Sequence, residues 1–468
     1  MNKEQLTLIK TLEKLKSGYW GIYHLGKYYV TINTQRVKDD DEKTSELDLL
    51  TSLQQENFVA MIHEYMHYIH EVSTYSGLMG LHFDIMRKAL LTKYLDSSSA
   101  SSMSHGIKTA IDKYQYLHTL SLEQVLHGST LVEYDNCKVF NVVNIDFDNT
   151  ESYRLLEKDD NKFVHVPLIE VNILDVQIKQ IKLHFGRFFV LEGIAYEIDR
   201  LVDKAIYERI EIIDTAPNSE YTVLRSVVNY IAPGMTTYDM LTLASLSLSY
   251  NEVGKRFVEM LRRFLFLSKR DKGDALDIIK NETSLYLDKI KTDLFSELND
   301  TVKIFIGRKQ LSKAFKYLIS EAKKLHLARI ENPSFEIDLI FQGRFQQLYK
   351  DIAPSDQLFT FISDDEYMRD ILTTSLDSDI SQAHKVLIGF SHYASAHLIH
   401  STSTIENKDD YKCPFYSICN LPSRTKYDQL CSTKPWRLYE IHASSDHRHC
   451  WYGQGVLELK GINDISRR

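Results

Sequence analysis

The sequence predicts an α+β fold that is mainly α-helical, with a small N-terminal sheet, a large helical region and a Cys-rich C-terminal segment. Three observations predict this fold. Apolar residues recur at helical spacing from Asp175 onward, β-branched and aromatic residues cluster in short runs before that point, and four of the five cysteines follow residue 411. We expect a first domain over residues 1–231, a helical domain over 232–400 and a Cys-rich segment over 401–468.

The composition is that of a folded protein. Of the 468 residues, 43% are hydrophobic and 26% are charged, which excludes a mainly disordered chain. The formal net charge of -8 does not favour nucleic acid or an anionic membrane as a partner. The first 20 residues lack the apolar core of a signal peptide, and the two least charged long stretches carry polar or helix-breaking residues. With only five cysteines, these features predict a cytoplasmic protein that does not span a membrane.

Hydrophobic periodicity predicts the elements in order. Glu4–Leu15 has apolar residues at three-residue spacing and is expected to be a helix, and Tyr19–Asn33 is expected to be a hairpin. A second helix is expected over Glu46–Val72, and strands are expected within residues 138–173. The other predicted helices are Gly80–Tyr94, Ser104–Thr119, Val223–Ile231, Asp239–Leu267, Ala275–Leu298, Arg308–Leu327 and Leu376–His400.

The sharpest motif is His63-Glu64-Tyr65-Met66-His67, within the second predicted helix. Four-residue spacing places both imidazoles on one face of a helix, one turn apart, where they can bind a single zinc ion at about 2.0 to 2.1 Å. The carboxylate of Glu64 can then activate a zinc-bound water as a general base. The motif therefore predicts a catalytic zinc site, which needs a third protein ligand.

The third ligand is expected on another part of the chain. His70 and Glu71 lie one turn beyond the motif, and their distance from the metal favours supporting roles. A metzincin-type continuation fails because Ser73 stands where a third histidine is required. Glu192 interrupts the apolar helix predicted over Phe188–Asp199, and a buried carboxylate there needs a cation as its partner. Glu192 is therefore the predicted third ligand.

Two segments together resemble the gluzincin metallopeptidases, namely His63-Glu64-x-x-His67 and Leu191-Glu192-Gly193-x-Ala195. The resemblance implies that residues 1–231 form a zincin-like catalytic domain in which His63, His67 and Glu192 bind zinc. It also implies that Glu64 is the general base. Glu192 lies 125 positions after His67 (192 minus 67), a longer separation than is usual in the aminopeptidase-like gluzincins. The residues that follow the motif also resemble an uncharacterised group of bacterial HExxH proteins.

Other polar side chains are candidates to complete the site. Tyr196 and Asp199 share a helix face with Glu192. Tyr196 is predicted to donate a hydrogen bond to a developing oxyanion, and Asp199 to orient a histidine ligand. Tyr221 and Arg225 are alternative contacts for the oxyanion or for a substrate carboxylate.

The C-terminal segment carries a second group of metal-binding residue types, namely Cys413, Cys419, Cys431 and Cys450. Four thiols within 38 positions can surround one metal centre, and either a structural zinc ion or an iron–sulfur cluster suits them. His447 or His449 can replace Cys450 as the fourth ligand. Buried free cysteines are the alternative interpretation, and Cys137 is expected to be an inert thiol.

These features predict a zinc-dependent hydrolase, an endopeptidase that cleaves a protein partner. The strand-like segment Tyr28–Asn33 precedes the metal helix, as does the zincin edge strand that pairs with extended polypeptide. Two alternatives stay open: a metal-dependent hydrolase of a non-peptide amide or ester, and a helical, metal-stabilised regulatory or scaffold protein without catalysis. The large helical region after residue 231, which the chemistry does not need, suggests control by a regulatory protein partner.

Overall fold

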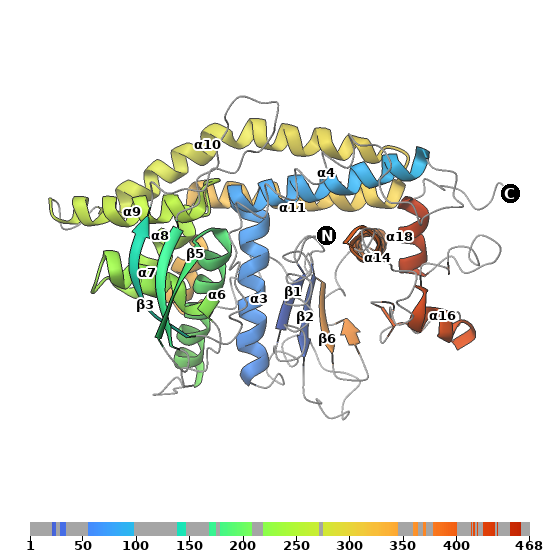
Figure 1. Cartoon of the computed structure of the whole chain (residues 1–468). Coiled ribbons are helices and arrows are strands. Elements are labelled where there is room, and N and C mark those ends of the chain that lie inside the picture. The colour runs from blue at the N-terminus through green and yellow to red at the C-terminus, as the bar shows by residue number, and fades with distance from the viewer. Residues whose placement is uncertain are drawn as a thin grey trace.

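The computed structural model describes residues 21–24, 29–33, 55–97, 138–146, 168–174, 178–207, 219–270, 275–344, 359–363, 368–370, 378–399, 413, 415–416, 419, 425–435, 438 and 450–459. Within these ranges the chain is mainly helical and carries two small sheets (Figure 1). The predicted α+β, mainly α class is confirmed at this level.

The helices vary in length from single turns to long rods. They are α3 (Gln55–Ser73), α4 (Tyr75–Ser97), α6 (Arg187–Tyr207), α7 (Ser219–Ile231), α8 (Thr237–Ser247), α9 (Val253–Ser268), α10 (Ala275–Val302), η2 (Lys303–Phe305), α11 (Lys309–Glu331), α12 (Phe335–Phe341), α14 (Ser378–Ile399), α16 (Asp428–Thr433) and α18 (Trp451–Leu459). The strands are β1 (Gly21–His24), β2 (Tyr29–Asn33), β3 (Lys138–Asp146), β4 (Leu168–Leu174), β5 (Ile178–His184), β6 (Phe359–Ser363) and β7 (Met368–Asp370).

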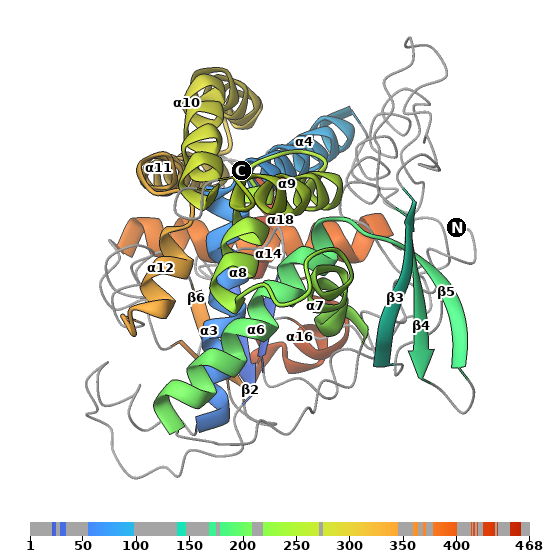
Figure 2. The same cartoon turned by 90° about the vertical axis from the view of Figure 1, so that its left-hand side faces the viewer.

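The two sheets lie on opposite sides of α3 (Figure 1). One has the order β1-β2-β6-β7, with β1 and β2 antiparallel and with β2 parallel to β6, so that Tyr29 lies opposite Phe359. The other is an antiparallel sheet in the order β3-β4-β5, which lies beside α7 in Figure 2. Strand β1 is therefore an edge strand, and its neighbour on the outer side is α3.

Helix α3 runs through the middle of the molecule, below the layer of α4, α10 and α11 (Figure 1). Its apolar side chains, including Met61, Tyr65 and Ile69, belong to a continuous hydrophobic core that extends from β2 to α18. Between residues 61 and 74, every position is buried except His63 and His67, which are one turn apart. The sequence pattern thus buries the helix and leaves the two imidazoles on its one accessible face.

A buried polar network holds the C-terminal end of α3. Glu336 of α12 lies 3.1 Å from the Nε2 atom of His70, and its Oε1 atom accepts a hydrogen bond from the Nη1 atom of Arg329 on α11 at 3.2 Å. The Nε atom of Arg329 donates to the hydroxyl of Ser73 at 3.0 Å, and Ser245 of α8 donates to Glu336. Arg329, Glu336 and His70 are fully buried, so the network links α3 to three helices of the later chain.

Most of the predicted elements are present where they are described. The hairpin is formed by β1 and β2, and Val139–Val143 lies in β3. The predicted helix Asp239–Leu267 is wrong as one element, because the chain breaks between α8 and α9. The predicted helices Glu4–Leu15 and Ser104–Thr119 lie outside the described residues.

The strands differ from the prediction in two ways. Helical structure was expected from Asp175 onward, but Ile178–His184 forms β5, where the exposed residues 180 and 182 alternate with apolar residues, including the buried Leu183. The prediction of an edge strand at Tyr28–Asn33 is wrong, because β2 pairs with a strand on each side and β1 lies at the edge of the sheet. A second sheet was also not predicted.

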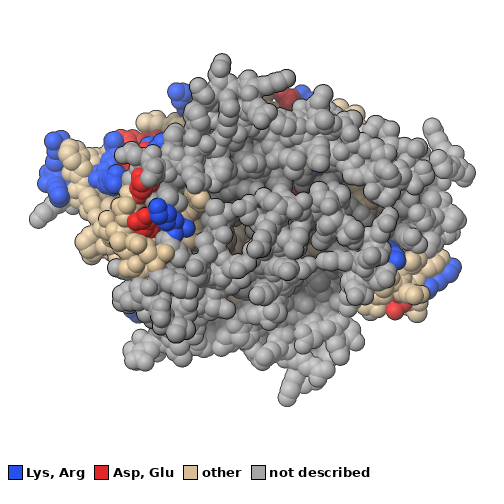
Figure 3. Space-filling view, viewed as in Figure 1, with Lys and Arg blue, Asp and Glu red and all other residues tan. Residues whose placement is uncertain are grey.

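The described surface carries charges of both signs. In Figure 3, Lys and Arg side chains lie beside Asp and Glu side chains on the described parts of that face. Arg256 and Glu259 pair at 3.2 Å on α9, and Arg263 pairs with Glu282 of α10. None of the described helices has both the length and the apolar character needed to cross a membrane.

Candidate metal site

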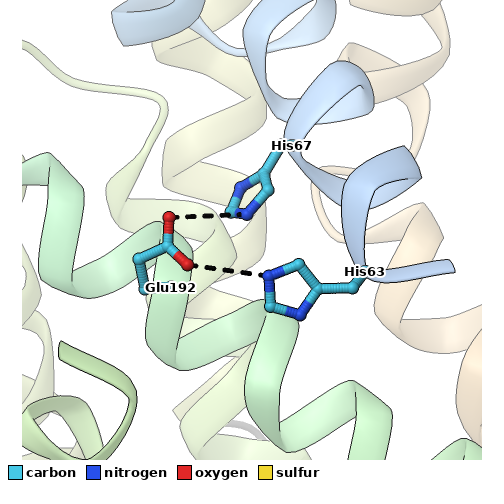
Figure 4. A group of neighbouring side chains, drawn as sticks. All are labelled: His63, His67 and Glu192. Atoms are coloured by element: carbon cyan, nitrogen blue, oxygen red, sulfur yellow. Dashed lines mark ion pairs between the residues drawn. The ribbon is translucent and has the colours of Figure 1, made fainter. Parts of the chain in front are cut away.

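Three predicted ligands from two helices converge beside the core. His63 and His67 project from α3, and Glu192 projects toward them from α6 (Figure 4). Glu192 lies 3.6 Å from the Nε2 atom of His63 through one carboxylate oxygen and 3.5 Å from the Nε2 atom of His67 through the other. Among the described residues, this is the one group of three His, Cys, Asp or Glu side chains whose ligand atoms all lie within 4.8 Å of one another.

These separations fit a tetrahedral zinc ion. Bonds of about 2.0 to 2.1 Å at tetrahedral angles separate neighbouring ligand atoms by about 3.3 Å, close to the spacing of the two imidazoles from Glu192. The side chains of His63, His67 and Glu192 remain 12%, 11% and 19% exposed, so the site is not sealed from solvent. The arrangement can therefore hold a metal ion and leave a coordination position accessible.

Close packing of two helices positions Glu192. Its neighbour Gly193 faces α7, where an added Cβ would lie 2.3 Å from the Cβ atom of Leu224. No larger side chain fits there without moving α7, so the glycine allows α6 and α7 to approach each other. This approach also brings Tyr221 of α7 next to the ligands, where its ring lies 6.1 Å from that of His63.

Asp199 supports the first histidine. Its Oδ2 atom lies 2.8 Å from the Nδ1 atom of His63, on the opposite side of the ring from Glu192. A carboxylate that accepts the Nδ1 proton fixes the tautomer and leaves the lone pair of Nε2 available to a metal ion. This contact is the one that the predicted role of Asp199 needs, and the role itself stays a prediction.

Burial and the charges of neighbouring groups shift the pKa values of His63 and Glu192 in opposite directions. Burial lowers the pKa of His63, but the carboxylates of Asp199 and Glu192 raise it well above its ordinary value. Burial raises the pKa of Glu192, yet the two imidazoles hold it well below the usual range. Without a metal, His63 can therefore carry a proton that compensates the carboxylates, and a divalent cation would replace that proton.

The predicted general base lies between α3 and the edge strand. The backbone N–H of Tyr23 in β1 donates a hydrogen bond to the carboxylate of Glu64, and the Tyr23 hydroxyl donates to Glu71. Burial raises the pKa of Glu64 above its ordinary value. The sequence did not identify Tyr23, since only the strand position relative to α3 reveals its role.

Two tyrosine rings pack beside the site, Tyr221 against His63 and Tyr196 against Tyr221. The ring of Tyr221 contacts His63, and the ring of Tyr196 lies 5.5 Å from that of Tyr221. The role of Tyr196 at an oxyanion stays a prediction. Arg225, an alternative candidate, makes a two-point ion pair with Glu197 and also donates to Thr237. His70 and Glu71 contact Glu336 and Tyr23 instead of joining the three ligands.

Four cysteines of the C-terminal segment form no disulfide, namely Cys413, Cys419, Cys431 and Cys450. Cys413 and Cys431 are buried, and the other two are partly buried. Burial raises the pKa of the Cys413 thiol, and it raises the pKa of Cys450 to about 11. Cys137, His447 and His449 lie outside the described residues.

The chain was compared with known proteins at three levels. Protein families, curated proteins and solved structures gave no match. The gluzincin resemblance therefore stays a prediction that depends on the site residues themselves.

Proposed function

We propose that the chain is a zinc-dependent hydrolase of gluzincin type, an endopeptidase with a zincin-like core. The observation that carries the proposal is the convergence of His63, His67 and Glu192, whose ligand atoms lie within 4.8 Å of one another. Glu64 lies on the same helix as the two histidines, and Asp199 orients one of them. Two imidazoles, one carboxylate and an adjacent glutamate are the side chains that metal-assisted hydrolysis requires.

Each side chain has a separate task in this proposal. When bound, zinc supplies a Lewis acid that polarises the scissile carbonyl and makes water a nucleophile near neutral pH. Glu64 takes a proton from the attacking water and delivers it to the leaving nitrogen. Its raised pKa suits this exchange, because a base that titrates closer to neutral pH also returns the proton readily. Tyr23 holds the Glu64 carboxylate through its backbone N–H.

The edge strand supports an extended polypeptide as the substrate. Tyr23 directs its N–H to Glu64, so the outer edge of β1 faces the metal helix. Gly21 lies two positions earlier and presents its backbone to the same side. Because Glu64 already accepts from the Tyr23 N–H, a peptide could pair with this edge only at Gly21, beside Glu64. We propose the reducing cytoplasm as the location of the activity, since the four described cysteines form no disulfide.

A matched pair of variants tests the proposal. Glu64→Gln and Glu71→Gln make the same change two helical turns apart on α3, and both side chains contact Tyr23. The zinc content of each purified variant is measured by mass spectrometry, and cleavage of a mixture of unstructured peptides is followed in parallel. We expect both variants to keep one zinc ion at the histidine site, and only Glu64→Gln to lose cleavage, by roughly 10²-fold or more.

The same experiment separates the alternatives. Cleavage of simple esters but not of peptides by the zinc-loaded wild-type chain would favour the non-peptide hydrolase. Zinc retention with no hydrolysis of either substrate class, and with Glu64→Gln fully functional in the cell, would favour a metal-stabilised scaffold. Loss of hydrolysis in Glu71→Gln as well would contradict the specific role of Glu64. A regulatory partner would be indicated if the isolated chain hydrolyses peptides only after a cell extract is added.

A further inference from the structure

The four C-terminal thiols approach one another from separate parts of the segment. Cys413 is close enough for electrostatic interaction with all three other thiols, and Cys450 is close enough to Cys419. The backbone N–H of Cys413 donates to the carbonyl of Cys431 at 2.8 Å. This hydrogen bond brings the main chain of Cys413 into direct contact with that of Cys431. The side chains of these two residues therefore start from neighbouring positions.

Backbone N–H groups are directed at two of the sulfur atoms. The N–H of Gly453 donates to the Sγ atom of Cys450 at 3.4 Å, and the N–H of Tyr452 also contacts it, at the first turn of α18. The N–H of Phe415 contacts the sulfur of Cys413 in the same way. These N–H groups offset only part of the effect of burial, which raises the pKa of both thiols. They nevertheless supply hydrogen bonds that a metal-bound thiolate can accept, and a metal ion would supply the positive partner that buried thiolates need.

We propose that Cys413, Cys419, Cys431 and Cys450 bind one zinc ion, which fixes the C-terminal segment to the helical part of the molecule. Each thiol releases its proton to solvent as the ion binds. Among the described residues, no three of these sulfur atoms lie within 4.8 Å of one another. Four thiolates around zinc lie about 3.8 Å apart, so binding brings them closer together. This inference does not depend on the proposed hydrolase.

Zinc suits the segment better than an iron–sulfur cluster. Cys413 and Cys431 are joined by a backbone hydrogen bond, whereas a cluster spreads its four ligands over a larger body. The ion would also fix α18, which begins directly after Cys450. Helix α18 in turn contacts the start of α11, where the carboxylate of Glu458 accepts from the backbone N–H groups of Gln310 and Leu311 at 3.3 and 3.4 Å. The proposed role of this ion is therefore structural.

Metal analysis of the full chain tests the site. We expect two zinc ions per wild-type chain, and one in each of the variants Cys413→Ser and His67→Ala. Cysteine at position 137 is the matched control, and Cys137→Ser should keep both ions. After exchange with cobalt(II), thiolate-to-cobalt charge-transfer absorption should appear in wild type and His67→Ala and be absent from Cys413→Ser. This absorption reports the thiol site alone, so it remains informative if the hydrolase proposal fails.

A second measurement applies if Cys413→Ser does not fold. An organomercurial reagent added to the wild-type chain should release one zinc ion as it modifies the four thiols, while His67→Ala should release all of its zinc. The proposal is overturned if wild type and His67→Ala lack the thiolate-to-cobalt absorption, or if the reagent modifies the thiols without releasing zinc. Iron with visible absorption in the purified chain would overturn it in favour of a cluster.

Discussion

Asp199 offers a graded test of the metal site. Its Oδ2 atom lies 2.8 Å from Nδ1 of His63, and its side chain is 23% exposed, so the hydrogen bond is partly shielded from water. A hydrogen bond to a charged group contributes about 1.5 to 3 kcal/mol, which corresponds to roughly 10- to 100-fold in zinc affinity. We expect about 10-fold weaker zinc binding in Asp199→Asn, where an amide oxygen still accepts the proton, and about 100-fold in Asp199→Ala.

The affinities are measured by competition with a chromophoric chelator. Glu197→Gln is the control, because Glu197 lies on the same helix and is more deeply buried, but pairs with Arg225 rather than with a metal ligand. If zinc affinity merely followed helix stability, Glu197→Gln would weaken binding at least as much as the Asp199 variants. That result, or an Asp199→Ala variant with wild-type affinity, would refute the orienting role of Asp199.

Three further outcomes are expected. Glu336→Gln should lower the free energy of unfolding by about 3 to 5 kcal/mol in urea titrations, because it leaves the buried guanidinium of Arg329 without its carboxylate. The double variant Glu336→Gln/Arg329→Met should lose less free energy of unfolding than the sum of the losses in the two single variants. Burial lowers the pKa of His384 from 6.5 to about 4, so the folded state resists protonation and stability falls as the pH drops below 6.5. Between pH 7 and pH 5 this group should cost about 2 kcal/mol, and His384→Phe should lose that much less over the same interval in denaturant titrations. If Tyr221 stabilises the oxyanion, Tyr221→Phe should lower kcat for peptide cleavage roughly 10²-fold with little change in KM. Tyr196→Phe should lower kcat less, because the ring of Tyr221, and not that of Tyr196, contacts His63. A larger loss of kcat in Tyr196→Phe would assign the oxyanion role to Tyr196.

The three candidate metal ligands could be selected from the sequence because the constraint on them is local. Helical spacing alone places His63 and His67 on one face, and a carboxylate within an apolar helix marks Glu192 as a group that needs a cation. Asp199 follows from the same periodicity, seven residues after Glu192. Which partner each of these side chains meets depends on the crossing of α3 and α6, and for that step the sequence offered only the resemblance.

The missed features depend on contacts between distant segments. Strand β5 has only a short alternating pattern, which the long helical pattern that follows it obscured. β2 becomes an inner strand because it pairs with β6, and nothing in the local pattern of Tyr29–Asn33 distinguishes an inner strand from an edge strand. Tyr23 acts through its backbone, so no residue type could reveal its hydrogen bond to Glu64.

The parallel pairing of β2 with β6 has a consequence for the timing of folding. β6 begins 326 positions after β2 ends (359 minus 33), so the sheet next to the metal helix closes only after most of the polypeptide has left the ribosome. A nascent chain that already carries both histidines and Glu192 still lacks the strand that supports β1 and β2. The order of synthesis thus delays completion of the proposed hydrolytic centre until the later segments are present.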